Sequence, residues 1–278
     1  MSSVLYDAPG PKARVRHRAV GVVGTAIVIG VLVFVVGQLA ATGQFSEAKW
    51  KIFSFPLVQQ TILQATGATL SAFGVAGVGS LALGLVLAIG RLSDRQWIST
   101  PCHWFTELFR AVPLLVMMMM IYYGLPALLG VSWPPYAAVV IALVLYNGSV
   151  LAEVFRSGVE ALPRGQREAG VAVGLSKSQV MVNILLPQAI RSMLPVIISQ
   201  MVVALKDTAL GFIVTYNEIL FQAKYFGSQA QYGSPIIPSA IVAGVLYVGM
   251  CLVLSGLAKL AELHLRSGRL GLKRPRPV

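Results

Sequence analysis

The sequence predicts an all-α membrane protein with six transmembrane helices, and three observations lead to this fold class. Hydrophobic residues make up 56% of the 278 residues and only 12% are charged. Soluble domains carry about 25% charged residues. The mean hydropathy is +0.75, as expected of a chain that lies mostly in lipid. The apolar residues also occur in continuous runs, whereas the strands of a membrane barrel alternate between apolar and polar residues.

Six apolar runs are long enough to cross the roughly 30 Å of a bilayer's hydrocarbon core, which takes about 20 helical residues. They are, in chain order, Ala19–Ala41, Leu63–Ile89, Val112–Leu129, Pro135–Phe155, Met193–Val214 and Ile237–Leu257. The first run follows basic residues, as in a signal peptide, but it exceeds the usual stretch of about 7–15 apolar residues and no A-x-A cleavage site follows. We therefore expect a retained helix at 19–41, ahead of a five-helix core within 61–257.

The basic residues predict which helix ends face the cytosol. With the N-terminus inside, three of the 22 Lys and Arg fall outside (Lys49, Lys51 and Lys224), Lys206 falls within a span, and the remaining 18 are cytosolic. Cytosolic loops of membrane proteins carry such an excess of Lys and Arg. The sequence thus predicts a multi-pass protein with both termini in the cytosol, in basic tails at 1–18 and 258–278.

The predicted cytosolic loop at 160–188 has a distinctive pattern. From Glu168 to Pro187 it reads E-A-G-V-A-V-G-L-S-K-S-Q-V-M-V-N-I-L-L-P. Gly174 allows a turn that a Cβ atom would hinder, which predicts two short helices on either side of it. The second is amphipathic, and we expect it to stop before Pro187, because the residue before a proline disfavours helix.

This stretch resembles the EAA loop of binding-protein-dependent ABC importer permeases, with Gly170 where the second Ala usually stands. In that family the loop is a coupling helix that docks into a groove on a cytosolic ATPase. The resemblance implies that seven residues take part in the coupling: Glu168, Ala169, Gly170, Gly174, Ile184, Leu186 and Pro187. The alternative is an ordinary interfacial helix pair, in which Glu168 is an acid at a helix start, favoured there by the helix dipole.

Further segments are similar to signatures of the polar amino acid branch of these permeases. Phe109–Leu115 (F-R-A-V-P-L-L) is similar to "fRgtPLL", and Asn147–Val159 (N-G-S-V-L-A-E-V-F-R-S-G-V) to "AY-x-aEi-xRggi". The remaining matches are Gly165–Ala169 to "GQ-x-EA" and Lys206–Leu210 to "KDTSL". The chain departs from these patterns at 147–149 and at Ala209.

The resemblance implies a substrate pathway near Asn147, Glu153, Lys206, Asp207 and Thr208. Glu153 is expected to pair with Arg156 three residues on. Lys206 and Asp207 are expected near the middle of a span, where a charge is costly in lipid. Adjacent helical residues do not face each other. Each charge therefore needs another helix, a subunit interface or a polar cavity, and for Lys206 a substrate α-carboxylate or a structural ion pair fits.

The opening segment, Ser2–Pro11, resembles the longer permease subunit of actinobacterial glutamate importers. The resemblance thus implies the permease subunit of an ATP-driven L-glutamate importer in a bacterial cell membrane. Importers of glutamine, aspartate or arginine are alternatives. An ion-coupled secondary transporter with Lys206 and Asp207 as a relay is a further one, which the lack of a detectable inverted repeat disfavours.

The implied partners are a cytosolic ABC ATPase dimer, a sister permease, an extracytoplasmic substrate-binding lipoprotein, the amino acid and membrane lipid. The sequence has no G-x-x-x-x-G-K-[ST] motif, so we expect no cofactor in this chain, ATP bound by the partner, and no enzyme activity of its own. We expect no metal site, since the three His are scattered and the two Cys form no C-x-x-C. We expect no nucleic-acid binding either, because the positive charge lies between apolar runs and forms no patch.

Overall fold

The computed structural model describes residues 10–267, and in this range it contains helices and no strand, which confirms the all-α prediction. Five helices are long and apolar enough to cross a membrane, and a bent pair of shorter helices supplies a sixth crossing if it is counted as one span. These are the predicted five-helix core and the additional N-terminal helix. Residues 1–9 and 268–278 lie outside the described range, and with them most of Ser2–Pro11 and part of both predicted basic tails.

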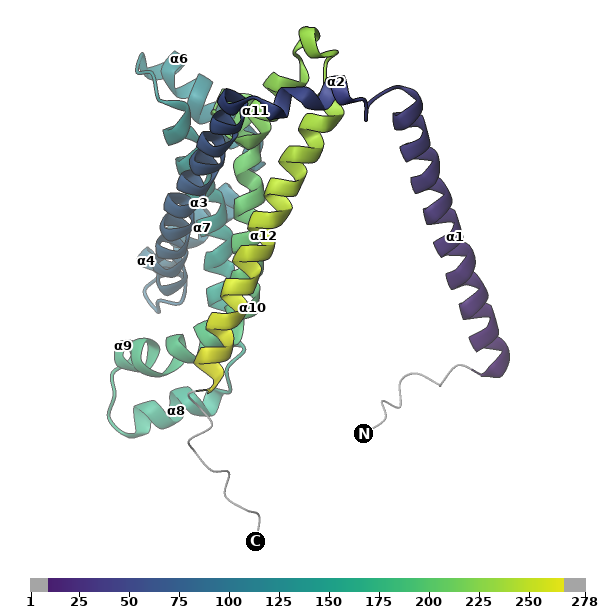
Figure 1. Ribbon diagram of the computed structural model, residues 1–278. Helices are drawn as coiled ribbons and strands as arrows, with labels where there is room; N and C mark the ends of the chain where they lie inside the picture. Colours follow the sequence, from purple (N-terminus) through teal and green to yellow (C-terminus); the bar gives the residue numbers. More distant parts are fainter. Residues whose placement is uncertain (1–9, 268–278) are drawn as a thin grey trace.

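The N-terminal helix α1 (Pro11–Ala41) stands apart from the other helices (Figure 1), and none of its residues is buried. It begins eight residues before the predicted start at Ala19, inside the predicted basic tail. The short helices α2 (Glu47–Trp50) and η1 (Lys51–Ser54) connect it to the core. Of these connecting residues Ile52 is buried, which fixes the end of the connection to the core.

The core is built on α3 (Pro56–Arg91) and α7 (Pro135–Glu160), which share the most extensive contact between helices. Their backbones approach closely at two glycines. A Cβ atom on Gly84 would lie 2.8 Å from the Cβ of Leu151, and one on Gly148 would lie 2.9 Å from a methyl group of Leu83. In a bilayer there is no water to exclude from between helices, so their association depends on close van der Waals packing. Small residues at such crossings allow that packing.

The third predicted span, Val112–Leu129, corresponds to the second part of a sharply bent pair. Helix α4 (Gln96–Ala111) ends before Pro113, and the chain continues through α5 (Leu114–Met119), η2 (Met120–Gly124) and α6 (Leu125–Leu129). The two parts are bent by 97°. Pro113 explains the break, because the residue before a proline is driven out of the helical conformation.

The loop between α7 and the next long helix contains α8 (Arg164–Ala172) and α9 (Lys177–Val180). Helix α9 continues without interruption through the π-helical turn η3 (Met181–Leu185) into α10 (Leu186–Asp207) and the 3₁₀ turn η4 (Thr208–Val214). This 38-residue stretch shows that the predicted stop before Pro187 is wrong. The wider π turn removes the need for the N–H that proline lacks, so the helix bridges the proline instead of ending there.

The chain then forms α11 (Ile219–Gly227), η5 (Ala230–Tyr232) and α12 (Ile236–Ser267). Helix α12 extends ten residues past the predicted end at Leu257. Figure 1 shows α8 and α9 at the same end of the molecule as the start of α1 and the end of α12, with α2, α6 and α11 at the opposite end. This arrangement agrees with the predicted topology, and the cytosolic location of that end stays a prediction.

Candidate functional site

The turn between α8 and α9 is built by local hydrogen bonds. The N–H of Leu175 donates to the carbonyl of Gly170 (3.2 Å) and that of Gly174 to Val171 (3.0 Å), the two bonds of a Schellman cap. Gly174 has φ +86°, a conformation that disfavours a side chain. The predicted break at Gly174 is therefore present, and a glycine is required there.

Helix α9 starts with a capping box. The N–H of Gln179 donates to the Ser176 hydroxyl (3.3 Å), and the Ser176 N–H donates to Oε1 of Gln179 (2.8 Å). These reciprocal bonds satisfy two donors at the helix start. Together with the Gly174 turn, they shape the connection between α8 and α9.

Gly170 is buried where α8 rests on the following helix. A Cβ atom on it would lie 2.8 Å from a methyl group of Val180 and 3.0 Å from the end of the Ile184 side chain. Leu186 is buried and Pro187 is half-buried beside this contact. Four of the predicted coupling residues (170, 184, 186 and 187) thus face inward, where they set the position of α8.

Two other predicted coupling residues, Glu168 and Ala169, are exposed on α8. Helix α8 begins at Arg164 and has no acid in its first turn, so the interpretation of Glu168 as a helix-start acid is wrong. Within residues 10–267 no ion pair of Glu168 is found. Val171, three residues on and so on the same face of α8, is 50% exposed. An unpaired carboxylate and an exposed apolar side chain on one face are suited to contact a partner protein.

The α8–α9 segment (residues 164–180) is tied to the turn between α3 and α4. Lys177 Nζ donates to a carboxylate oxygen of Asp94 at 2.6 Å, and Arg167 lies 3.9 Å from the other oxygen. The hydrogen bond and charge of Lys177, with a smaller contribution from Arg167, hold the pKa of Asp94 below its usual value. A groove between the two segments is lined by residues that include Leu92, Arg164 and Val182.

Glu153 lies in an ion cluster that joins two of the signature segments. Its predicted partner Arg156 is 2.5 Å away, so the predicted ion pair is present. Arg91 of α3 also approaches Glu153, at 2.9 Å, and Glu107 and Arg110 of α4 complete the cluster. Arg91 was not predicted as a partner, because it is far from Glu153 in the sequence and no local spacing indicates the contact.

Asn147 is fully buried and joins α7 to α10. Its side-chain oxygen accepts a hydrogen bond from Gln200 (2.8 Å), and its amide donates to the carbonyl of Leu143 (3.1 Å). The side chain is thus already bonded within the core. In the described structure it supports the packing of the helices that line the predicted pathway.

Lys206, Asp207 and Thr208 lie where α10 changes into the 3₁₀ turn η4, so the predicted regular helix around them ends here. Thr208 is buried, and its hydroxyl donates to Leu205 (2.6 Å). Asp207 is half-buried, and Lys206 is exposed toward a groove between α10 and α12 whose lining includes Tyr247, Cys251 and Ser255. Within residues 10–267, neither Lys206 nor Asp207 forms an ion pair within 4 Å.

Sequence reasoning missed the buried carboxylate of Glu218. It caps α11, accepting hydrogen bonds from the backbone N–H groups of Leu220 and Phe221 and from the hydroxyl of Tyr247, each at 2.7 Å. An acid directly before the mostly apolar segment 219–226 is an N-cap signal, so the cap could have been predicted. The contact with Tyr247 could not, since α12 is distant in the sequence.

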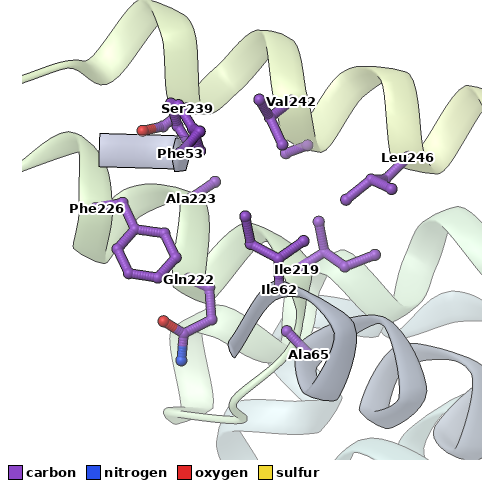
Figure 2. A pocket seen from close by; sticks show the side chains of 11 residues that line it. Phe53, Ile62, Ala65, Ile219, Gln222, Ala223, Phe226, Ser239, Val242 and Leu246 are labelled. Atoms are coloured by element: carbon purple, nitrogen blue, oxygen red, sulfur yellow. The ribbon is translucent and has the colours of Figure 1, made fainter. Parts of the chain in front are cut away.

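A pocket lies between α3, α11 and α12 (Figure 2), and its chemistry does not suit an amino acid. Gln222 and Ser239 are the only polar side chains among its lining residues, and none of these carries a charge. A zwitterion buried there would lack ionic partners for both its carboxylate and its ammonium group, at a large cost. The groove beside Lys206 is the better candidate.

Comparisons with known proteins agree with this arrangement. Residues 80–267 match the family model described as "Binding-protein-dependent transport system inner membrane component". The "Glutamate transport system permease protein GluD" of Corynebacterium glutamicum is 36% identical over 235 residues, which cover 84% of this chain and 85% of that protein. The "Arginine transport system permease protein ArtQ" of Bacillus subtilis is 31% identical over 74% of this chain and 93% of that protein.

Solved structures have the same fold. A crystal structure of an amino acid ABC transporter with histidines matches with a TM-score of 0.66 at 28% identity, over 74% of this chain and 94% of the other. The MetNI methionine ABC transporter in an inward-facing conformation matches with a TM-score of 0.61 at 14% identity, a likeness of fold alone. Both matches cover about three quarters of this chain.

Proposed function

The chain belongs to the family of binding-protein-dependent transport system inner membrane components, and on this premise we propose that it is the permease subunit of an ATP-driven importer of L-glutamate. The choice of glutamate as the substrate rests on the 36% identity with the glutamate permease over 235 residues. The match with the arginine permease covers 207 residues at 31% identity. The match with the glutamate permease is therefore both longer, by 28 residues, and higher in identity.

The α8–α9 segment is proposed to dock on the ATPase through the exposed surface around Glu168 and Ala169. Its position is held by the Gly174 turn, the Ser176 capping box, the close contact at Gly170 and the ion pair to Asp94. In the proposed mechanism, ATP binding closes the ATPase dimer and moves this segment. The chain supplies the lever and the path, and the partner supplies the hydrolysis.

The continuous helix from α9 to η4 gives this movement a route to the pathway. It runs from Lys177 to Val214 without a loop, so a displacement of α9 moves the residues around Lys206 through helical backbone that lacks only the N–H groups of Pro187 and Pro195. A hinge at Pro187 would have absorbed part of that displacement. The helical passage through Pro187 thus favours a direct coupling between the ATPase end and the groove beside Lys206.

The groove between α10 and α12 is proposed to be closed by a sister permease, and the two subunits to enclose the path. An ammonium group facing lipid at mid-membrane costs about 2.5–3.5 kcal/mol on insertion scales. A sister subunit or a water-filled path removes that cost, and Lys206 can then contact the α-carboxylate of the amino acid. An extracytoplasmic binding lipoprotein would deliver the substrate at the end of the molecule that holds α2, α6 and α11.

Reconstitution tests the substrate. The chain is assembled in liposomes with its ATPase, sister permease and binding protein, and the uptake of labelled glutamate is measured with and without ATP. We expect ATP-dependent uptake that unlabelled glutamate inhibits more strongly than glutamine, aspartate or arginine. Stronger inhibition by one of the other amino acids would assign the transporter to that substrate. Uptake that continues without ATP hydrolysis would instead indicate an ion-coupled transporter.

A further inference from the structure

Five charged residues from three helices form the ion cluster described above: Arg91, Glu107, Arg110, Glu153 and Arg156. Helix α3 contributes the first, α4 the next two and α7 the last two. The side chain of Arg91 is only 8% exposed, so its charge depends on the surrounding acids. A buried charge without such partners would be strongly destabilising.

Glu153 is the residue that connects all three helices. Its carboxylate lies 2.9 Å from Arg91, 2.5 Å from Arg156 and 3.9 Å from Arg110. Glu107 shares two of these partners, at 3.5 Å from Arg91 and 3.3 Å from Arg110. The two acids therefore compete for the same two arginines, one acid on α7 and the other on α4.

The ion cluster lies close to two segments that are expected to move. Helix α7 ends at Glu160, and α8 begins at Arg164 after a short turn. Helix α4 ends at Ala111 and leads through Pro113 directly into α5. The cluster thus lies between the segment proposed to meet the ATPase and the bend at the start of a membrane-spanning stretch.

We propose that Glu153 is a positioning residue that transmits the movement of α8 to α4 and α5. This inference rests on the proposed coupling of α8 to an ATPase. Because Arg91 and Arg110 can each bind Glu153 or Glu107, α4 shifts against α7 by exchanging partners, and no charge is left unpaired during the shift. An apolar contact of the same size would have to separate or repack.

The test compares Glu153→Gln with the matched control Glu160→Gln. Glu160 is an acid on the same helix that bonds Arg156 at 2.5 Å, is 53% exposed, and has no ion pair to α3 or α4 in residues 10–267. Uptake and ATP hydrolysis are both measured in the complete transporter, with whichever amino acid the wild type imports. We expect the uptake per ATP hydrolysed to fall roughly 5- to 150-fold in Glu153→Gln, as when two sites lose their coupling, and to stay unchanged in Glu160→Gln.

A second measurement is independent of the substrate. Spin labels at Leu108 on α4 and Ser178 on α9, both exposed, report the distance between α4 and the α8–α9 segment with and without ATP. We expect an ATP-dependent change in the wild type and in Glu160→Gln, and its loss in Glu153→Gln. A wild type that imports no glutamate would contradict the proposed substrate, and the distances would still test the role of Glu153.

Three results would overturn the inference. Unchanged uptake per ATP in Glu153→Gln is one, and a fall in uptake and hydrolysis together, in proportion to the amount of assembled protein, is another. The third is a wild-type distance that does not respond to ATP. If Glu153→Gln does not assemble, Glu107→Gln makes the same test from α4, where the side chain is 42% exposed.

Discussion

Lys177 and Asp94, 83 positions apart in the sequence, are joined by a hydrogen-bonded ion pair of 2.6 Å that ties α9 to the turn between α3 and α4. The stability of this pair is expected to decrease at low pH. The pKa of Asp94 is lowered in the folded protein, mainly by Lys177. The stabilisation that the ion pair gives the folded state is therefore complete above the ordinary carboxyl pKa of about 3.9. It is lost as the pH falls through the lowered pKa of Asp94.

We predict that this tether persists from about pH 8 to about pH 5, because the carboxylate stays ionised there. Spin labels at Gln96 and Ser178 would measure the separation of the two segments. Asp94→Asn should broaden the distance distribution at every pH, while the wild type should broaden only below about pH 4. Since both side chains are exposed, we expect a small effect on overall stability. Identical distributions in the two proteins would show that the tether does not hold α9.

The second prediction concerns Gly174, whose φ of +86° no L-residue adopts easily. Gly174→Ala should cost about 1–2 kcal/mol, the penalty for a Cβ atom in a left-handed conformation. Gly165→Ala is the matched control, because a Cβ atom would meet open space at both positions and only Gly174 has a positive φ. Hydrogen exchange across residues 170–176 measures the local free energy of opening. Equal protection in the two variants would rule out backbone strain as the reason for the glycine.

The third prediction tests the docking surface. Glu168 is exposed on α8, and it forms no ion pair with any other residue of the described chain. Glu168→Ala should weaken the binding of the ATPase by about 10-fold, the equivalent of one hydrogen bond to a charged group, and leave the membrane helices folded. Co-purification of the ATPase, titrated to an apparent Kd, measures this. Glu160→Ala, which removes an acid from the end of α7, should bind normally, and equal binding by both variants would mean that Glu168 is not in the interface.

The fourth prediction fixes the orientation. Single cysteines are introduced at Ser178 in α9 and at Lys224 in α11, both exposed, after the native Cys102 and Cys251 have been replaced. An impermeant thiol reagent added outside intact cells should label position 224 and leave 178 unlabelled until the cells are opened. The reverse pattern would contradict the positive-inside assignment and the cytosolic location of both termini.

Local signals in the sequence predicted the local structure. The break at Gly174 follows from the conformational freedom of one residue, and the pairing of Glu153 with Arg156 follows from helical spacing. The stop before Pro187 was wrong for a related reason. A proline disfavours α-helix before it, but a π turn tolerates the missing N–H, and no residue pattern in 181–185 distinguishes the two outcomes.

Contacts between distant segments could not be predicted in the same way. Arg91 reaches Glu153 because α3 and α7 cross closely at Gly84 and Gly148, which is a property of the packed helices. The bond from Tyr247 to Glu218 likewise depends on how α12 lies against α11. The candidate site was thus predicted as a set of residues, and the division between inward supports and an outward surface came from the fold.

The last prediction concerns Lys206, which is exposed toward the groove between α10 and α12 at the end of α10. No carboxylate in residues 10–267 lies within 4 Å of its ammonium group. A charge at this depth is kept at a cost of about 2.5–3.5 kcal/mol if it faces lipid. The neighbouring Asp207 does not remove the cost, because adjacent residues on a helix point in different directions. A ligand or a second subunit is then the expected partner.

We therefore predict that Lys206→Ala abolishes uptake at normal membrane abundance, and that Lys206→Arg restores only part of it. Arginine keeps the charge, but its planar head is larger than the compact ammonium group and bonds in a different geometry. Lys224→Ala is the control, because it removes an exposed lysine that contacts the Phe212 ring at 5.0 Å outside the groove. Uptake is measured together with the amount of assembled transporter. A loss of abundance in Lys206→Ala would indicate a structural ion pair with another subunit, since an unpaired buried partner costs about 3–5 kcal/mol. Normal uptake by Lys206→Ala would remove the residue from the transport mechanism.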